Sequence, residues 1–341
     1  MTAMLPVASR IGVRNVTIRT SFRRSRSSTM STMATTPYLI SPSQLHESLQ
    51  SSGGVSVLDA SWFMPNSPRK PQEEFNKKRI PGAQFLDLDQ VASPHELGLK
   101  HMMPSESVFA AACEGFGIEP NSHVVIYDTH GVFSSPRALF MFRAFGHSKS
   151  SILDGGLPRW ETGGFETEDA PPVDRKKSTY PTPILDRTVV RSYEQVVENS
   201  MLDPALDPSA ELVVDARSRG RFTGTDPEPR PGLSSGHIPH SFSLPFNAFL
   251  RTHTIPNTST QYTTFLPISE LRQALVDAIG TEQVEVILSG KRRITTSCGS
   301  GMTAGILWLG LRMLGAKSVS LYDESWTGYA SRSESRIEKS A

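Results

Sequence analysis

Short apolar runs rich in β-branched residues alternate along this chain with longer segments whose apolar residues recur at helical spacing. The short runs predict buried strands, and they include residues 57–60, 124–128, 213–217 and 294–298. Residues 136–145 and 303–314 have the helical spacing and predict helices. Strands that alternate with helices in this order are typical of α/β domains with parallel sheets.

The two halves of the chain repeat one plan at a separation of about 160 residues. A strand that ends near Asp59 in the first half corresponds to a strand that ends near Asp215 in the second half. A chain of 341 residues is long enough for two domains with separate cores. We therefore expect two tandem α/β domains, each a mainly parallel sheet flanked by helices.

Composition along the chain predicts where these domains begin and end. A Pro-rich, charged stretch at 166–186 is typical of a linker. We expect the first domain at 37–165, the second domain at 187–330 and a polar tail at 331–341, after an N-terminal segment at 1–36.

The N-terminal segment is basic. No acidic residue precedes Glu47, and six arginines lie there among many serines and threonines. This composition predicts a mitochondrial transit peptide rather than a secretory signal, and a disordered basic tail is the alternative. Initiation at Met30 or Met33 would give a cytoplasmic form without the arginines.

The whole chain has a formal net charge of +1 at pH 7 and 20% charged residues, so we expect no direct contact with nucleic acid. No apolar run reaches the roughly 18 residues of a membrane span, and we expect no membrane contact. Its only two cysteines, Cys113 and Cys298, do not suit a disulfide framework or a metal cluster. Cys113 lies among small apolar residues in a helical stretch and is expected to be buried and inert.

Cys298 ends a predicted strand, and a glycine-rich stretch and then a predicted helix follow it. Backbone N–H groups of the loop and of the helix N-terminus converge at such a junction and favour a thiolate. Gly299 and Gly301 allow the loop to curl around the sulfur with its amides inward. Most free cysteines are small buried hydrophobes, but this context predicts a nucleophile.

A second class of cysteine loop, that of phosphatases, closes on phosphate with an arginine six residues after the cysteine. That position is Ala304 here, and the next arginine is Arg312. Without the guanidinium fork that phosphate needs, the loop suits a smaller and less charged cargo, such as one sulfur atom.

The loop Cys-Gly-Ser-Gly-Met-Thr that begins at Cys298 resembles the active loop of the 3-mercaptopyruvate sulfurtransferases, in the rhodanese superfamily. An Ile-Pro-Gly motif, an Asp-Ala-Arg strand end and a Tyr-Asp-x-Ser-Trp motif support the resemblance, which covers residues 38–330. It implies two rhodanese-like domains of which only the second is catalytic. The first has Asp128 at the position of Cys298, and a carboxylate cannot form a persulfide.

The resemblance implies a sulfurtransferase in which Cys298 takes sulfur from 3-mercaptopyruvate as a persulfide, releases pyruvate and passes the sulfur to a thiol or to cyanide. Cys298 and Ser300 are the implied catalytic residues. Arg221 and Arg230 are implied to hold the substrate carboxylate, which arginine binds bidentately. The other implied substrate-binding residues are Gly299, Gly301, Met302 and Thr303.

Thr303 also stands where it could cap the following helix. Many relatives carry a histidine where this chain has Arg79, so the proton relay of that histidine is not carried over. Arg79 could instead supply positive potential near the cleft, although it cannot act as a base. We expect Arg217 and Arg219 to be structural or solvated, and His237 to be structural. The basic run at 291–293 is expected to be a solvated turn, and an adaptor surface for a protein or RNA partner is the alternative.

The resemblance implies no metal or organic cofactor. As partners it implies a small-molecule sulfur donor and a thiol acceptor such as thioredoxin. Two alternatives stay open: a thiosulfate sulfurtransferase, and a sulfur-relay protein that hands sulfur to a protein partner for tRNA thiolation. Thiosulfate-using members usually carry basic residues directly after the cysteine, where this chain has Gly299 and Ser300.

Overall fold

The computed structural model describes residues 1–6, 8, 12, 36–51, 54–173 and 175–340. The chain separates into a short unit, Met1–Thr35, and a folded unit, Thr36–Ala341. Most of the predicted transit peptide lies outside the described residues, as do the possible internal starts Met30 and Met33.

The first half of the folded unit contains a five-stranded sheet. Its strands are β1 (Leu39–Ile40), β2 (Val55–Asp59), β3 (Gln84–Phe85), β4 (His123–Tyr127) and β5 (Ser150–Leu153). Its helices are α1 (Pro42–Gln50), α2 (Pro71–Lys77), α3 (Glu106–Gly115), α4 (Ser135–Ala144) and α5 (Gly156–Thr162). The strands lie in the order β1-β5-β4-β2-β3, and every pair is parallel.

The second half repeats this sheet. Its strands are β6 (Val190–Arg191), β7 (Leu212–Asp215), β8 (Phe242–Ser243), β11 (Ile294–Ser297) and β12 (Val319–Tyr322). Its helices are α6 (Tyr193–Ser200), α7 (Arg219–Thr223), η1 (Phe246–Phe249), α8 (Ile268–Ile279), α9 (Thr281–Leu288), α10 (Ala304–Met313) and α11 (Ser325–Ala330). The order β6-β12-β11-β7-β8 matches the first sheet strand for strand, and all pairs are parallel. The predicted α/β class, with two parallel sheets flanked by helices, is confirmed.

An antiparallel hairpin in the second half was not predicted from the sequence. It consists of β9 (Leu250–Thr254) and β10 (Gln261–Phe265). The hairpin packs on the first half: the Thr263 N–H donates to the His130 carbonyl at 3.0 Å, and the Phe265 N–H donates to Asp154 Oδ1 at 2.9 Å. The second half therefore covers the loop that follows β4.

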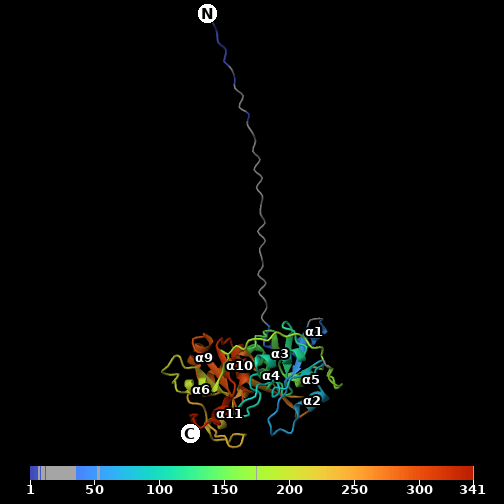
Figure 1. Cartoon of the computed structure of the whole chain (residues 1–341), viewed down its shortest axis with the longest axis vertical. Helices are drawn as coiled ribbons and strands as arrows, with labels where there is room; N and C mark the ends of the chain where they lie inside the picture. Colours follow the sequence, from blue (N-terminus) through green and yellow to red (C-terminus); the bar gives the residue numbers. More distant parts are fainter. Residues whose placement is uncertain (7, 9–11, 13–35, 52–53, 174, 341) are drawn as a thin grey trace. The chain divides into compact units, whose positions relative to one another are not determined.

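Helices α4 and α10, one from each half, lie side by side at the centre of the folded unit (Figure 1). They begin and end within one residue of the two predicted helices. A Cβ atom on Gly305 would lie only 2.8 Å from the backbone nitrogen of Arg137, so glycine is needed for this close approach. Phe140 and Trp308 meet edge to face, 5.2 Å apart, within one hydrophobic core that both halves share.

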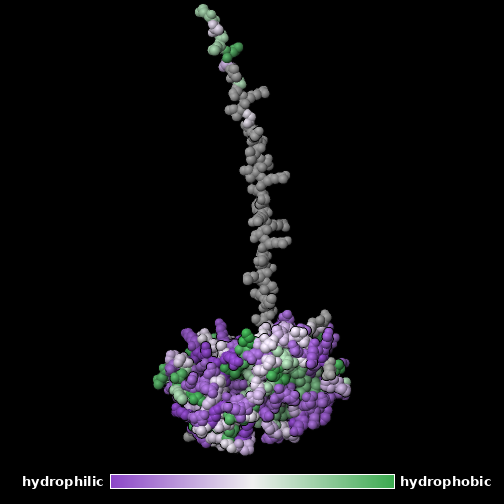
Figure 2. Space-filling model, viewed as in Figure 1, coloured by the Kyte–Doolittle hydropathy of each residue, from purple (hydrophilic) through white to green (hydrophobic). Residues whose placement is uncertain are grey.

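The folded unit has a largely polar surface. Hydrophilic residues cover most of the face shown in Figure 2, and hydrophobic residues are scattered over it. Large exposed apolar side chains include Ile184, Leu206 and Ile268, which are far apart in the sequence. Within the described ranges, no helix combines the length and the apolar character needed to cross a bilayer.

Candidate functional site

Cys298 lies where the sequence predicts it, between a strand and a helix. It follows β11 directly, and α10 begins at Ala304. Ser297 pairs with Asp215 on the neighbouring strand β7, so Cys298 lies at the carboxyl edge of the second sheet. Open α/β sheets bind ligands at this edge. The thiol side chain is well enclosed, with 1% of the residue exposed.

The Ser325 side chain is hydrogen-bonded to Cys298, a contact that was not predicted from the sequence. The Cys298 N–H donates to Ser325 Oγ at 3.1 Å. The Ser325 hydroxyl in turn faces two acceptors, the Tyr322 carbonyl at 2.9 Å and Cys298 Sγ at 4.0 Å. Ser325 has a φ of 51°, which is uncommon for serine. Its motif, Tyr-Asp-x-Ser-Trp, was visible in the sequence, but its position beside the thiol was not.

Arg221 and Arg230 both reach the loop that follows Cys298. A Cβ atom on Gly299 would lie 3.2 Å from Arg221 Nη2 and 3.5 Å from Arg230 Nη1. Burial lowers the pKa of Arg230, and the neighbouring charge of Cys298 opposes this effect. The structure thus brings both predicted arginines to the cysteine loop, where they could hold a carboxylate.

The two arginines differ in their partners. Arg221 pairs with Glu228 at 2.5 Å, whereas Arg230 forms no ion pair within the part of the chain that the structure describes. The Glu228 side chain is buried and also accepts from Arg217 at 2.7 Å, and Arg217 is paired with Asp215 at 2.5 Å. Arg217 is structural, as predicted, because this buried network fixes the position of Arg221.

The loop glycines and their neighbours have distinct roles in the geometry. Gly301 has a φ of +82°, and a Cβ atom there would lie 2.6 Å from the Asp323 carbonyl oxygen, so only glycine fits. Met302 is buried beside it. Thr303 occupies the N-cap position of α10, but its side chain makes no capping hydrogen bond, so the predicted cap is wrong in that respect. Ser300 is half-buried.

Residues of the first half, which were not predicted as site residues, also reach this loop. His101 Nε2 lies 2.7 Å from the Ser300 carbonyl oxygen, and His101 Nδ1 lies 2.8 Å from Asp89 Oδ1. Both ring nitrogens therefore face oxygen atoms, one in each half of the chain. Burial acts to raise the pKa of Asp89, but the hydrogen bond and the charge of His101 outweigh it and lower that pKa.

Arg137 ties the two halves together beside the same loop. It is only 2% exposed, and its guanidinium donates to the His101 carbonyl at 2.7 Å and to Asp323 Oδ1 at 2.5 Å. The Met103 N–H donates to the other oxygen of Asp323 at 2.8 Å. These bonds fix His101 and the Cys298 loop relative to each other across the domain interface.

The corresponding loop of the first half binds the carboxylate of Asp128 through its backbone N–H groups. Asp128 Oδ2 accepts the backbone N–H groups of Phe133, Ser134 and Ser135 at 2.8 to 3.0 Å. Its Oδ1 accepts the His130 N–H at 3.0 Å. The loop amides of this repeat therefore converge on an anion. Because the Cys298 loop occupies the same place in the matching strand–loop–helix unit, we infer the same inward orientation for its amides.

The position of Arg79 differs from the one expected from the sequence. Arg79 does not supply positive potential to the cleft but is buried elsewhere, with its Nε donating to Glu168 Oε1 at 3.0 Å and its guanidinium 5.1 Å from the Phe75 ring centre. Its charge holds the residues of the predicted linker against the first half. His237, at the matching position of the second half, is structural as predicted: its ring stacks on Phe222 at 4.1 Å.

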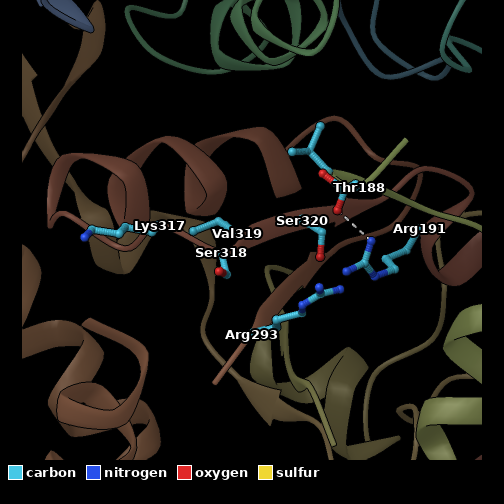
Figure 3. Close-up of a pocket in the computed structure, with 8 residues that line it drawn as sticks. Thr188, Arg191, Arg293, Lys317, Ser318, Val319 and Ser320 are labelled. Carbon is cyan, nitrogen blue, oxygen red and sulfur yellow. Dashed lines mark hydrogen bonds between the residues drawn. The ribbon is translucent and has the colours of Figure 1, made fainter. Parts of the chain in front are cut away.

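The basic run at 291–293 lies before β11, at the sheet edge opposite Cys298. Arg293 and Arg191 line a cavity of about 120 Å³ there (Figure 3). Glu211 holds Arg191 through two hydrogen bonds of 2.9 and 2.8 Å and lies 3.7 Å from Arg293. The run is therefore partly structural, and the prediction of a solvated turn is wrong in that respect.

The chain is similar to known proteins in sequence and in structure. A model of the rhodanese-like domain matches residues 41–162 and 198–332. A thiosulfate/3-mercaptopyruvate sulfurtransferase of Arabidopsis thaliana, named as mitochondrial, is 38% identical over 327 residues and covers 90% of this chain and 80% of its own length. The 3-mercaptopyruvate sulfurtransferase of Rattus norvegicus is 36% identical, with 87% of this chain and 93% of that protein covered. The crystal structure of SseA from Escherichia coli, a 3-mercaptopyruvate sulfotransferase with the rhodanese fold, has a TM-score of 0.70 and 27% identity and covers 85% of this chain and 99% of that one.

Proposed function

This chain belongs to the rhodanese family and is a sulfurtransferase, and on that premise we propose that it takes sulfur from 3-mercaptopyruvate on Cys298 and passes it to a thiol. The observation that supports this most is the pair of guanidiniums at the Cys298 loop, near 3.2 and 3.5 Å from the Cβ position of Gly299. An α-keto acid with one carboxylate and a terminal thiol can place its carboxylate on these arginines while its sulfur reaches Cys298.

The first step forms a persulfide. The Cys298 thiolate attacks the sulfur of 3-mercaptopyruvate, the sulfur–carbon bond breaks, and its electron pair moves to the carbon to give the enolate of pyruvate. The enolate takes up a proton and leaves as pyruvate, while Cys298 keeps the sulfur. This is covalent catalysis in two steps, with the enzyme thiol as the nucleophile.

The surrounding residues stabilise the charges that develop in this step. Negative charge grows on the keto oxygen and on the outer sulfur of the persulfide. Arg230 and the loop amides can donate to these atoms, and the Ser325 hydroxyl lies 4.0 Å from Cys298 Sγ. Ser300 is the second hydroxyl that we propose to assist the transfer. His101 holds the Ser300 carbonyl and so orients the loop. Gly299, Gly301, Met302 and Thr303 shape the rest of the proposed substrate site.

The second step returns the enzyme to its starting state. An acceptor thiolate attacks the outer sulfur of the Cys298 persulfide, the sulfur–sulfur bond breaks, and the Cys298 thiolate is released. We propose a reduced thioredoxin or a small thiol as the acceptor, and cyanide can take the same role in an assay. Delivery to a partner protein for tRNA thiolation uses the same intermediate and stays an alternative.

We propose that the protein acts in mitochondria. The basic, acid-free N-terminal segment and the mitochondrial name of the Arabidopsis thaliana relative support this location. A cytoplasmic form, started at Met30 or Met33, is part of the same proposal. Imaging of the full chain and of a Met30-initiated chain, each fused to a fluorescent protein, tests both, and mitochondrial signal from the shorter chain would contradict it.

The donor is tested by steady-state kinetics with 3-mercaptopyruvate and with thiosulfate. Thiosulfate has two negative charges and no keto acid, and the loop offers it Gly299 and Ser300 instead of basic side chains. We expect kcat/KM for 3-mercaptopyruvate to be at least about tenfold higher, which needs only ~1.4 kcal/mol of transition-state binding. Cys298→Ser serves as the blank. A preference for thiosulfate would favour the thiosulfate sulfurtransferase alternative.

A further inference from the structure

A second cavity, of about 370 Å³, lies beside the cavity of Figure 3, and the two share Thr188, Val189, Lys317 and Val319. Both halves form its walls, since Arg143 comes from α4 and Arg312 from α10. Val319 begins β12, whereas Cys298 follows the end of the parallel strand β11. The cavity therefore lies at the sheet edge opposite the Cys298 loop.

This cavity has more positive charge than its walls neutralise. Arg143, Arg312 and Lys317 line it, and none of the three forms an ion pair within the described ranges. The one carboxylate in the lining, Asp186, is exposed and already accepts the N–H and the hydroxyl of Thr188, at 2.9 and 2.6 Å. The arginines of the neighbouring cavity, in contrast, are held by a glutamate.

Two buried donors in the same walls have no protein acceptor among the described residues. They are Nε of Arg143 and the indole Nε1 of Trp308, and Trp308 is only 4% exposed. A buried N–H group without an acceptor destabilises the folded state. A site with two such donors and an excess of cations suits a ligand that is rich in oxygen acceptors.

Tyr38 holds the two guanidiniums at fixed positions in this cavity. The Arg143 guanidinium carbon lies 4.9 Å from the centre of the Tyr38 ring, and Arg312 Nε donates to the Tyr38 hydroxyl at 3.2 Å. Burial lowers the pKa of Arg143, and the like charge of Arg312 does so too, while Tyr38 acts against them. Like charges that are held together without a carboxylate are stabilised by a bound anion.

We propose that this cavity binds a phosphate dianion, either free or as the monoester of a small metabolite. Three cations against one exposed carboxylate leave about two charges to neutralise, which a dianion does and a single carboxylate does not. The volume is in the range of roughly 300–1,000 Å³ that small-molecule sites have, so a small organic group also fits. Because α4 and α10 both contribute, the bound phosphate ties the two halves together.

The test measures phosphate binding by calorimetry and by the melting temperature of the whole protein, at constant ionic strength. Inorganic phosphate should raise the melting temperature with increasing concentration, because a ligand of the native state stabilises it. Acetate, a monoanion, should not do so. Glycerol 3-phosphate is the second probe: tighter binding than inorganic phosphate assigns the site to a phosphate monoester, and weaker binding assigns it to free phosphate.

Two charge reversals provide the matched comparison. Lys317→Glu places a negative charge in the cavity and should weaken phosphate binding at least about tenfold, or ~1.4 kcal/mol. Lys291→Glu makes the same change in net charge at the same sheet edge, but outside the cavity lining, and should bind like the wild type. Sulfurtransferase activity of both variants reports that they are folded. Equal losses of binding in the two variants, or no phosphate-specific stabilisation of the wild type, would overturn the proposal.

Discussion

Arg230 and Arg221 face the same glycine of the cysteine loop, but only Arg230 is free of a carboxylate within the described residues. Its guanidinium can therefore pair with a substrate carboxylate without first leaving an ion pair. We expect Arg230→Ala to lower kcat/KM for 3-mercaptopyruvate by about 1.5–3 kcal/mol, the range of a hydrogen bond to a charged group, and Arg230→Lys to restore part of it. Arg221→Ala should cost less, because Glu228 already holds that arginine. Unchanged kinetics in Arg230→Ala would mean that the carboxylate binds elsewhere.

Asp59 is a buried carboxylate that makes stability depend on pH. Ser61 stands where the second half has Arg217, so Asp59 lacks a cationic partner of that kind, and burial raises its pKa to about 7. The folded pKa lies above the unfolded value near 3.8, so the stability present at acidic pH is lost as the pH rises from about 4 to about 7.

Replacing Asp59 by asparagine should remove this loss. Relative to the wild type, Asp59→Asn should gain on the order of 2–4 kcal/mol in unfolding free energy between pH 4 and pH 8, at about 1.4 kcal/mol per pKa unit. Urea unfolding at both pH values measures it, and comparing the two proteins cancels the contribution of the other carboxylates. A stability difference that does not vary with pH would contradict the assignment.

The contact between α4 and α10 places the Cys298 loop against the first half. A Cβ atom at Gly305 would meet the Arg137 backbone at 2.8 Å, and backbone cannot move aside as a flexible side chain can. Gly305→Ala should therefore destabilise the protein by about 1–3 kcal/mol and lower sulfurtransferase activity. The control is Gly115→Ala at the end of α3, where the added methyl group has open space and should be neutral or slightly stabilising. Equal stabilities of the two variants would show that the helices can separate at no cost.

Elements that depend on local pattern were predictable, and those that depend on distant contacts were not. The spacing of apolar residues predicts α4, α10 and the strand before Cys298. Burial imposes a characteristic spacing on helices and another on strands. The hairpin of β9 and β10 is rich in threonine, and it is held by bonds to the first half, at His130 and Asp154. Its signal was weak because its stability comes from that packing rather than from an alternating apolar pattern.

At the scale of the whole molecule, some residues of the candidate site could be predicted from the sequence and others could not. Cys298, Arg221 and Arg230 lie in motifs of the second half, so the sequence could point to them. His101 is 199 residues from Ser300 along the chain, and nothing in one sequence indicates that they meet. The domain limits at 37–165 and 187–330 stay predictions, with the family match at 41–162 and 198–332 inside or close to them.

The central claim is that Cys298 carries the transferred sulfur. The chain has only two cysteines, so Cys113 is the other candidate. Cys113 is buried in α3, and burial raises the pKa of its thiol, so it stays protonated and unreactive. Arg221 and Arg230 lie beside the loop that follows Cys298.

Mass spectrometry of the protein after brief incubation with 3-mercaptopyruvate, in the absence of an acceptor, tests this most directly. We predict the added mass of one sulfur atom on the peptide that contains Cys298 and none on the peptide that contains Cys113. The Cys298→Ser protein, whose fold a single oxygen-for-sulfur change should preserve, should gain no sulfur. Sulfur on Cys113 alone, or as much sulfur on Cys298→Ser as on the wild type, would contradict the account.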